Sequence, residues 1–174
     1  MNIRFSGFGG QGIILAGVIY GYAGTLDGKN VVQTQSYGSA SRGGACKCDV
    51  IISDDQIYEL EFPKPDILIS LSQQAYDKYV AQLKEDGMLI IEKDLVKTEK
   101  TDHPVHSISA TDIAFKKFGR KIMANMIVLG YMTASVNLVS KEAVKKAIRE
   151  NVPAGTEDIN IEAFEEGYKL GTKD

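Results

Sequence analysis

Residues 2–24 read NIRFSGFGGQGIILAGVIYGYAG, and this stretch decides the fold. Its first part, Asn2 to Ser6, is typical of a short strand, and after a run of glycines the apolar residues recur at helical spacing. Gly7, Gly9 and Gly12 form the pattern G-x-G-x-x-G between the strand and the helix, which is the context in which this pattern indicates a ligand-binding turn. The stretch therefore predicts a strand, a turn and a helix of an α/β fold.

A glycine turn of this kind leaves backbone N–H groups bare, so that an anion can approach them. The helix that begins near Gln11 adds unpaired N–H groups and the positive end of its dipole, which favours a phosphate or a carboxylate. A dinucleotide-binding turn also needs an Asp or Glu at the end of the second strand. Here that strand reads VVQTQ, with Gln33 and Gln35 and no acid, so NAD is disfavoured. The alternative is that the glycines only allow the strand and the helix to pack closely.

A second polar, glycine-rich loop, SYGSASRGG at residues 36–44, follows the next strand. Arg42 can present its planar guanidinium to a phosphate or a carboxylate, or it can pin the loop to backbone carbonyls or to a partner chain. The cofactor-binding candidates are the residues of the two loops: Gly7, Phe8, Gly9, Gly10, Gln11, Gly12, Ser41, Arg42, Gly43 and Gly44. No catalytic residue and no metal ligand is assigned.

The rest of the chain predicts a three-layer, Rossmann-like α/β domain over residues 1–174, with a mostly parallel sheet, a β-hairpin excursion and a helical C-terminal half. Strands are expected at 30–35, 45–53, 67–71, 87–92 and 105–108, and residues 56–61 (QIYELE) alternate like the hairpin partner of 45–53. Helices are expected at 75–83, 112–118, about 122–136, 141–151 and 160–170, with Ser140 and Asn160 as N-caps.

Composition excludes several classes of protein. The chain has 174 residues, of which 44% are hydrophobic and 25% charged, with a net charge of −3; this fits a globular domain with its own core. The first 53 residues carry four basic against two acidic side chains, so anions are tolerated there. The sequence contains no run of Lys or Arg that would indicate a nucleic-acid-binding groove. The uncharged stretch 122–139 contains Asn125 and Asn137, which favours a buried core or interface helix over a membrane span. An N-terminus without an apolar signal region indicates a cytoplasmic protein.

No complete catalytic constellation is visible. Cys46 and Cys48 are the only cysteines, too few for a four-thiolate cluster or zinc site, and they are expected to be buried free thiols. The acidic residues near predicted strand ends are expected to be solvated; they are Glu61, Asp66, Glu92 and Asp94. This pattern suggests a subunit that supplies a binding surface while other chains carry the reactive centre.

Six stretches of the sequence together resemble one known family. They are GFGGQG at 7–12, QSYGSASRGG at 35–44, VIISDDQI at 50–57, PDILISLSQQAYDKY at 65–79, ANMIVLGYM at 124–132 and INIEAFEEGY at 159–168. The chain resembles the gamma subunit of 2-oxoacid:ferredoxin oxidoreductases, most closely those that act on 2-oxoglutarate (2-oxoglutarate synthase). The resemblance runs nearly end to end.

The resemblance implies a complex that decarboxylates a 2-oxoacid oxidatively on thiamine diphosphate, passes electrons through iron–sulfur clusters to ferredoxin and releases an acyl-CoA. It implies partners of the alpha, beta and ferredoxin-like delta type, with no cofactor held by this chain alone and no activity of the isolated chain, which can self-associate. GFGGQG and SRGG would face coenzyme A or a neighbouring subunit. Two alternatives remain: a free-standing nucleotide-binding oxidoreductase of the Rossmann type, and a purely structural subunit.

Overall fold

The computed structural model describes residues 1–36, 45–98 and 101–172, and it places the strands in the first part of the chain and most of the helices in the last part. The strands are β1 (Asn2–Phe8), β2 (Asn30–Ser36), β3 (Ala45–Ser53), β4 (Ile67–Ser70), β5 (Met88–Glu92) and β6 (Val105–Ile108). The α-helices are α1 (Ile13–Leu26), α2 (Gln73–Tyr79), α3 (Ala110–Phe118), α4 (Ala124–Val136), α5 (Lys141–Asn151) and α6 (Glu157–Gly171). Two short 3₁₀ helices are η1 (Val80–Gln82) and η2 (Lys121–Met123).

The described strands form one six-stranded sheet in the order β2-β3-β1-β4-β5-β6. β1, β4, β5 and β6 pair in parallel, whereas β3 pairs antiparallel with both β1 and β2. The prediction of a mostly parallel sheet with a hairpin excursion is therefore confirmed, but the hairpin partner was wrong. β3 pairs with β2, and residues 56–61 form no strand.

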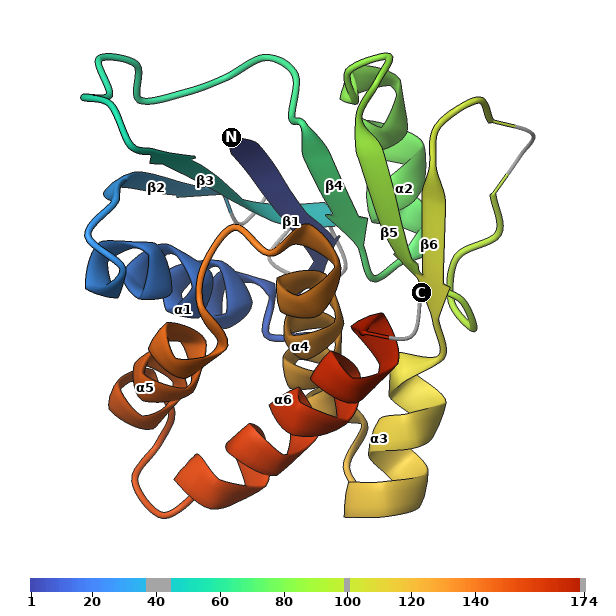
Figure 1. The fold of residues 1–174 in the computed structure, drawn as a ribbon. Helices are drawn as coiled ribbons and strands as arrows, with labels where there is room; N and C mark the ends of the chain where they lie inside the picture. The colour runs from blue at the N-terminus through green and yellow to red at the C-terminus, as the bar shows by residue number, and fades with distance from the viewer. Residues whose placement is uncertain (37–44, 99–100, 173–174) are drawn as a thin grey trace.

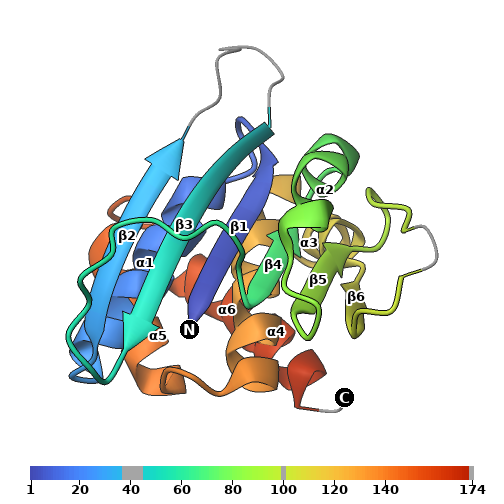
Figure 2. The same ribbon diagram turned by 90° about the horizontal axis from the view of Figure 1, so that it is seen from above.

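Helices cover both faces of the sheet, which gives the three layers that the sequence predicts (Figures 1 and 2). One face carries α1, α4, α5 and α6 with α3 beside them, and α2, which continues into η1, packs on the other face. A smaller apolar cluster lies under α2 and includes Leu68, Tyr76 and Leu89. Because parallel strands all end at the same edge, the loops that follow β1, β4 and β5 meet there.

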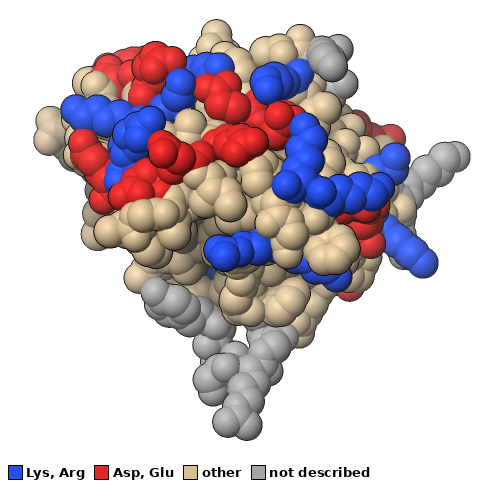
Figure 3. All heavy atoms as spheres, turned by 90° about the horizontal axis from the view of Figure 1, so that it is seen from below, with Lys and Arg blue, Asp and Glu red and all other residues tan. Residues whose placement is uncertain are grey.

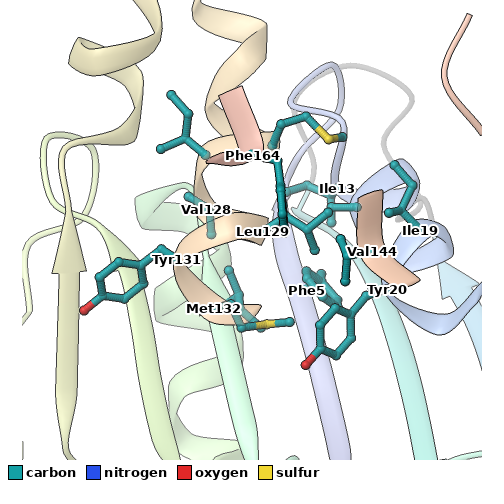
Figure 4. Packing of buried hydrophobic residues seen from close by; sticks show 14 of the residues in the cluster. Phe5, Ile13, Ile19, Tyr20, Val128, Leu129, Tyr131, Met132, Val144 and Phe164 are labelled. Atoms are coloured by element: carbon teal, nitrogen blue, oxygen red, sulfur yellow. The ribbon is translucent and has the colours of Figure 1, made fainter. Parts of the chain in front are cut away.

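The main core lies between the sheet and the larger helical layer (Figure 4). Phe5 of β1, Tyr20 of α1 and Phe164 of α6 meet side chains of the uncharged helix α4, of which every residue from 124 to 133 is buried. The expected burial of this helix is confirmed, and its burial partners lie in the same chain. No helix in the described part of the chain combines the length and the apolar character that a membrane crossing requires.

The capping residues Ser140 and Asn160 predict two helix starts, and one of the two predictions is correct. The Ser140 side chain accepts a hydrogen bond from the N–H of Ala143 at the start of α5, as an N-cap does. The Asn160 prediction is wrong, since α6 begins three residues earlier at Glu157. Asn160 instead lies in the first turn, and its side-chain amide donates to the backbone oxygen of Thr156.

Candidate functional site

A pocket of about 380 Å³ opens at the edge where β1, β4 and β5 end. Its lining residues come from the glycine loop, from the two following strand ends and from the α3–α4 region: Phe8, Gly9, Gly10, Gln11, Leu71, Glu92, Leu95, Thr111, Lys121, Ile122 and Ala124. In an open α/β sheet, ligands bind in the crevice beyond the carboxyl ends of the strands. The position and the size of this pocket are those of a small-molecule site.

The glycine loop divides into packing residues and pocket residues. A Cβ at Gly7 would lie 2.5 Å from Gln11 Oε1 and 2.7 Å from Ile13 Cδ1, and one at Gly12 would overlap the Asn125 side chain. Close packing thus explains Gly7 and Gly12. A Cβ at Gly9 or Gly10 would meet no atom within 4 Å. Packing does not require these two glycines, although the left-handed backbone of Gly10 (φ 97°) favours glycine there, and both line the pocket.

Gln11 holds the glycine loop against the end of β4. Its side-chain amide accepts a hydrogen bond from the N–H of Phe8 at 2.9 Å and donates one to the backbone oxygen of Leu71 at 2.7 Å. Within the described residues, the N–H groups of Gly9 and Gly10 make no hydrogen bond. The loop therefore presents bare donors on a backbone that its neighbours fix in place.

Glu92, at the end of β5, is the buried acid of the pocket, with only 1% of its surface exposed. Its Oε2 accepts hydrogen bonds from the N–H and the hydroxyl of Thr111 at 2.8 and 2.9 Å. Burial raises the pKa of the Glu92 carboxyl above its ordinary value, although the bonds from Thr111 and from the N–H of Asp94 lower it in part. The expectation of a solvated Glu92 is wrong, because α3 begins directly over this strand end.

This raised pKa predicts a pH-dependent effect of Glu92→Gln on stability. The folded state binds the Glu92 proton more tightly than the unfolded chain, so part of the stability is lost as the pH rises from the ordinary value of 4.5 through the folded pKa. Glu92→Gln removes this loss. We expect the stability of the variant relative to the parent to improve between about pH 4 and about pH 7.5 in urea unfolding. Glu142→Gln, at a side chain that is 81% exposed, is the control; an equal change there would contradict the assignment.

The rim of the pocket combines exposed apolar side chains with one cation. Phe8 and Leu95 are each 42% exposed and Ile122 is 48% exposed. Lys121 also lines the pocket, and its Nζ lies 5.9 Å from the centre of the Phe115 ring. Figure 3 views the end of the molecule at which the parallel strands finish: charged side chains gather over the helices, and the part nearer the sheet is mostly uncharged. Such an exposed apolar surface favours contact with a ligand or another protein.

The predicted second loop cannot be compared with this geometry, because Ser41, Arg42, Gly43 and Gly44 lie outside the described residues. Cys46 and Cys48 are buried free thiols, as predicted. Burial raises the pKa of the Cys48 thiol to about 11, so it stays protonated at neutral pH. Among the described residues, no group of three or more His, Cys, Asp or Glu side chains could hold a metal ion.

The order of the strands argues against a dinucleotide site. In a dinucleotide-binding unit the strand after the first helix lies beside the first strand and carries the acid for the ribose. Here β3 separates β2 from β1, and the Gln33 side chain donates to Cys48 Sγ at 3.1 Å. Gln33 and Gln35, which stand where NAD binding needs an acid, therefore lie on a strand that is not next to β1 and its glycine loop.

Comparisons with known proteins agree with this architecture. The family model described as pyruvate ferredoxin/flavodoxin oxidoreductase matches residues 2–170. The chain is 52% identical over 173 residues to the 2-oxoglutarate synthase subunit KorC of Methanocaldococcus jannaschii, covering 97% of this chain and 92% of that one. It superposes with a TM-score of 0.88 and 44% identity on the keto/oxoacid ferredoxin oxidoreductase gamma subunit of Geobacter sulfurreducens, covering 99% of each chain.

A more distant structure shares the fold. The 2-oxoglutarate:ferredoxin oxidoreductase of Magnetococcus marinus, solved with 2-oxoglutarate, coenzyme A and succinyl-CoA bound, matches with a TM-score of 0.89 at 21% identity. The match covers 100% of this chain and only 31% of the other chain. The same fold therefore occurs as one part of a much longer chain.

Proposed function

Because the chain belongs to the pyruvate ferredoxin/flavodoxin oxidoreductase family, as a gamma subunit of the 2-oxoacid:ferredoxin oxidoreductase type, we propose that its pocket receives coenzyme A in the assembled enzyme. The observation that carries the proposal is the pocket at the carboxyl edge, which is lined both by the open backbone of Gly9 and Gly10 and by the exposed Lys121. The M. marinus enzyme, of which one part has the same fold, was solved with coenzyme A bound.

The chemistry of coenzyme A matches the pocket in two respects. Its pantetheine arm is a narrow, flexible chain with two amides, and a lining of apolar side chains with bare N–H donors suits both parts of that arm. Its phosphates are anions, for which Lys121 offers a cation and the glycine loop offers N–H groups beside the N-terminus of α1. The chain carries no acid in the first turn of α1 that would repel an anion.

The reactive centre is assigned to partner subunits. Two cysteines are too few for a four-thiolate cluster, so we place the iron–sulfur clusters on a ferredoxin-like delta subunit or another partner. We place thiamine diphosphate on the alpha and beta subunits. The apolar rim formed by Phe8, Leu95 and Ile122 supports this arrangement, because a partner docked there would close the pocket toward its own reactive centre.

The substrate we propose is 2-oxoglutarate, with succinyl-CoA as product and ferredoxin as the electron acceptor. The similarity to 2-oxoglutarate synthase subunits supports this choice: the KorC subunits of M. jannaschii and of Methanothermobacter marburgensis are 52% and 43% identical to this chain. Two free thiols fit a reducing compartment such as the cytoplasm. The isolated chain is expected to be inactive. A tagged chain should co-purify with thiamine-binding and cluster-bearing subunits, and a lone chain that turns over substrate would refute this.

Charge reversal at Lys121 tests the proposed site. We expect Lys121→Glu to raise the KM for coenzyme A about tenfold in the assembled complex, because the cation facing the phosphates becomes an anion. The KM for the 2-oxoacid should stay unchanged. Lys121→Arg should retain most of the affinity. Lys146→Glu, on the exposed side of α5, is the control; an equal increase in that variant would mean that only the overall charge matters.

A further inference from the structure

Residues 56–61 (QIYELE), here called the 56–61 segment, have the alternation of a strand but are not in the sheet. Tyr58 is 84% exposed and Leu60 is 68% exposed. These two side chains are two residues apart and, in an extended chain, lie on the same side. They are the most exposed large apolar side chains among the described residues, and as a strand the segment would present both of them to one neighbour.

The main chain of this segment has no hydrogen-bond partner within the described residues. The main chain on either side of the segment does have partners. The N–H of Asp55 donates to Ser53 Oγ, and the carbonyl of Pro65 accepts from the N–H of Lys84. Between them, no N–H or C=O group of residues 56–61 makes a hydrogen bond to the described part of the chain. A stretch whose main chain is free on both edges can add to an open sheet edge once it adopts a strand conformation there.

The segment is nevertheless held in place at both ends. Before it, Lys29 pairs with Asp54 at 2.8 Å, and the Asn30 side chain donates to the backbone oxygen of Asp54. After it, Phe62 is buried, with its ring centre 5.4 Å from the guanidinium carbon of Arg4. The segment crosses from β3 to β4 at the end of the sheet opposite to the pocket (Figures 1 and 2). The contacts at both ends therefore fix where the segment runs.

The charges of the segment indicate what kind of edge it fits. Glu59 and Glu61 of the segment, and Asp55 just before it, make no ion pair with the described part of the chain, so they offer three carboxylates without an ion-pair partner there. The edge strands of a second copy of this chain offer no basic side chain to pair with these carboxylates. Its outer strands, β2 (NVVQTQS) and β6 (VHSI), contain no Lys or Arg.

We propose that the 56–61 segment is a docking strand, which pairs through main-chain hydrogen bonds with an open, Lys- or Arg-bearing edge strand of another subunit of the oxidoreductase complex. Tyr58 and Leu60 then pack on that subunit, and Glu59 and Glu61 pair with its basic side chains. The proposal rests on the membership of a multisubunit enzyme and on no property of the pocket. It therefore gives the chain a second interface, at the opposite end from the coenzyme A site.

Hydrogen exchange measured by mass spectrometry tests the main-chain bonds. In the isolated full chain, amides 56–61 should exchange close to the rate of an unstructured peptide, and in the purified complex they should slow by at least about 100-fold. Unchanged exchange in the complex would overturn the proposal. Protection that appears in the isolated chain at high concentration would also overturn it, because it would identify a second copy as the partner.

Two proline variants separate main-chain pairing from side-chain contact. Gln56 and Glu59 are an odd number of residues apart, so in a strand their N–H groups point to opposite sides. We expect one of Gln56→Pro and Glu59→Pro to weaken assembly by at least about tenfold and the other to be tolerated. An equal effect of both, or of neither, would overturn pairing with a single edge. Glu59→Gln is the control for the loss of the Glu59 charge. Val105→Ser, which removes exposed apolar surface outside the segment, is the control for a general effect of such a loss on assembly.

Discussion

Replacing Gly167 by alanine is expected to lower the free energy of unfolding by about 3 kcal/mol. Gly167 lies where α6 crosses α4, and a Cβ there would overlap the carbonyl oxygen of Ile127. The obstacle is helix backbone, which cannot rotate away as a side chain can. The same crossing uses Gly130, whose added Cβ would overlap the carbonyl of Phe164. Relief therefore requires the two helices to separate, and this opens the core that both of them line.

Urea and thermal unfolding of the full chain measure this effect. A loss of 3 kcal/mol corresponds to a decrease in Tm on the order of 10 °C for a chain of this length. Gly21→Ala is the matched control: Gly21 is also a buried helical glycine, but its Cβ would meet only side-chain atoms, Val31 Cγ1 at 3.3 Å and Val50 Cγ1 at 3.5 Å. It should change stability by less than about 1 kcal/mol. A Gly167→Ala variant as stable as Gly21→Ala would contradict the close helix crossing.

The second large effect is expected at Gly9. Gly9→Val should raise the KM for coenzyme A about a hundredfold in the assembled complex, because the new side chain enters the pocket. The fold should tolerate it, since a Cβ at this position meets no atom within 4 Å. The KM for the 2-oxoacid and the Tm of the complex should remain close to those of the parent.

Gly9→Ala provides the graded comparison for this variant. The smaller side chain fills less of the pocket and should cause a smaller rise in the KM for coenzyme A. Steady-state kinetics with purified complexes measure both variants, and gel filtration checks that assembly is intact. A Gly9→Val complex that assembles and keeps the parent KM would exclude this pocket as the coenzyme A site.

Much of the fold follows from local pattern. The strand, glycine turn and helix at the N-terminus, the apolar β4 and β5, and the uncharged helix α4 are where the sequence places them. The place of β3 does not follow from local pattern, because alternation of side chains predicts a strand but not its neighbours. Residues 56–61 illustrate the same limit: they alternate like a strand, yet their main chain finds no partner among the described residues.

The candidate site was only partly predictable for a similar reason. The spacing of the glycines indicated a ligand-binding turn, and Phe8, Gly9, Gly10 and Gln11 do line the pocket. Glu92 and Lys121 lie far from them in sequence, and only the parallel sheet and the path from α3 to α4 bring them to the same edge. One signal could have identified Glu92: an acid at the carboxyl end of a buried parallel strand is placed where such folds bind ligands.

The structure of the complete complex determined by cryo-electron microscopy with coenzyme A bound tests the central claim most directly. We expect ligand density in the pocket between the Phe8–Gln11 loop and Lys121, with a partner subunit covering the apolar rim. Coenzyme A bound entirely by other subunits, with this pocket open to solvent or filled by a partner side chain, would contradict it.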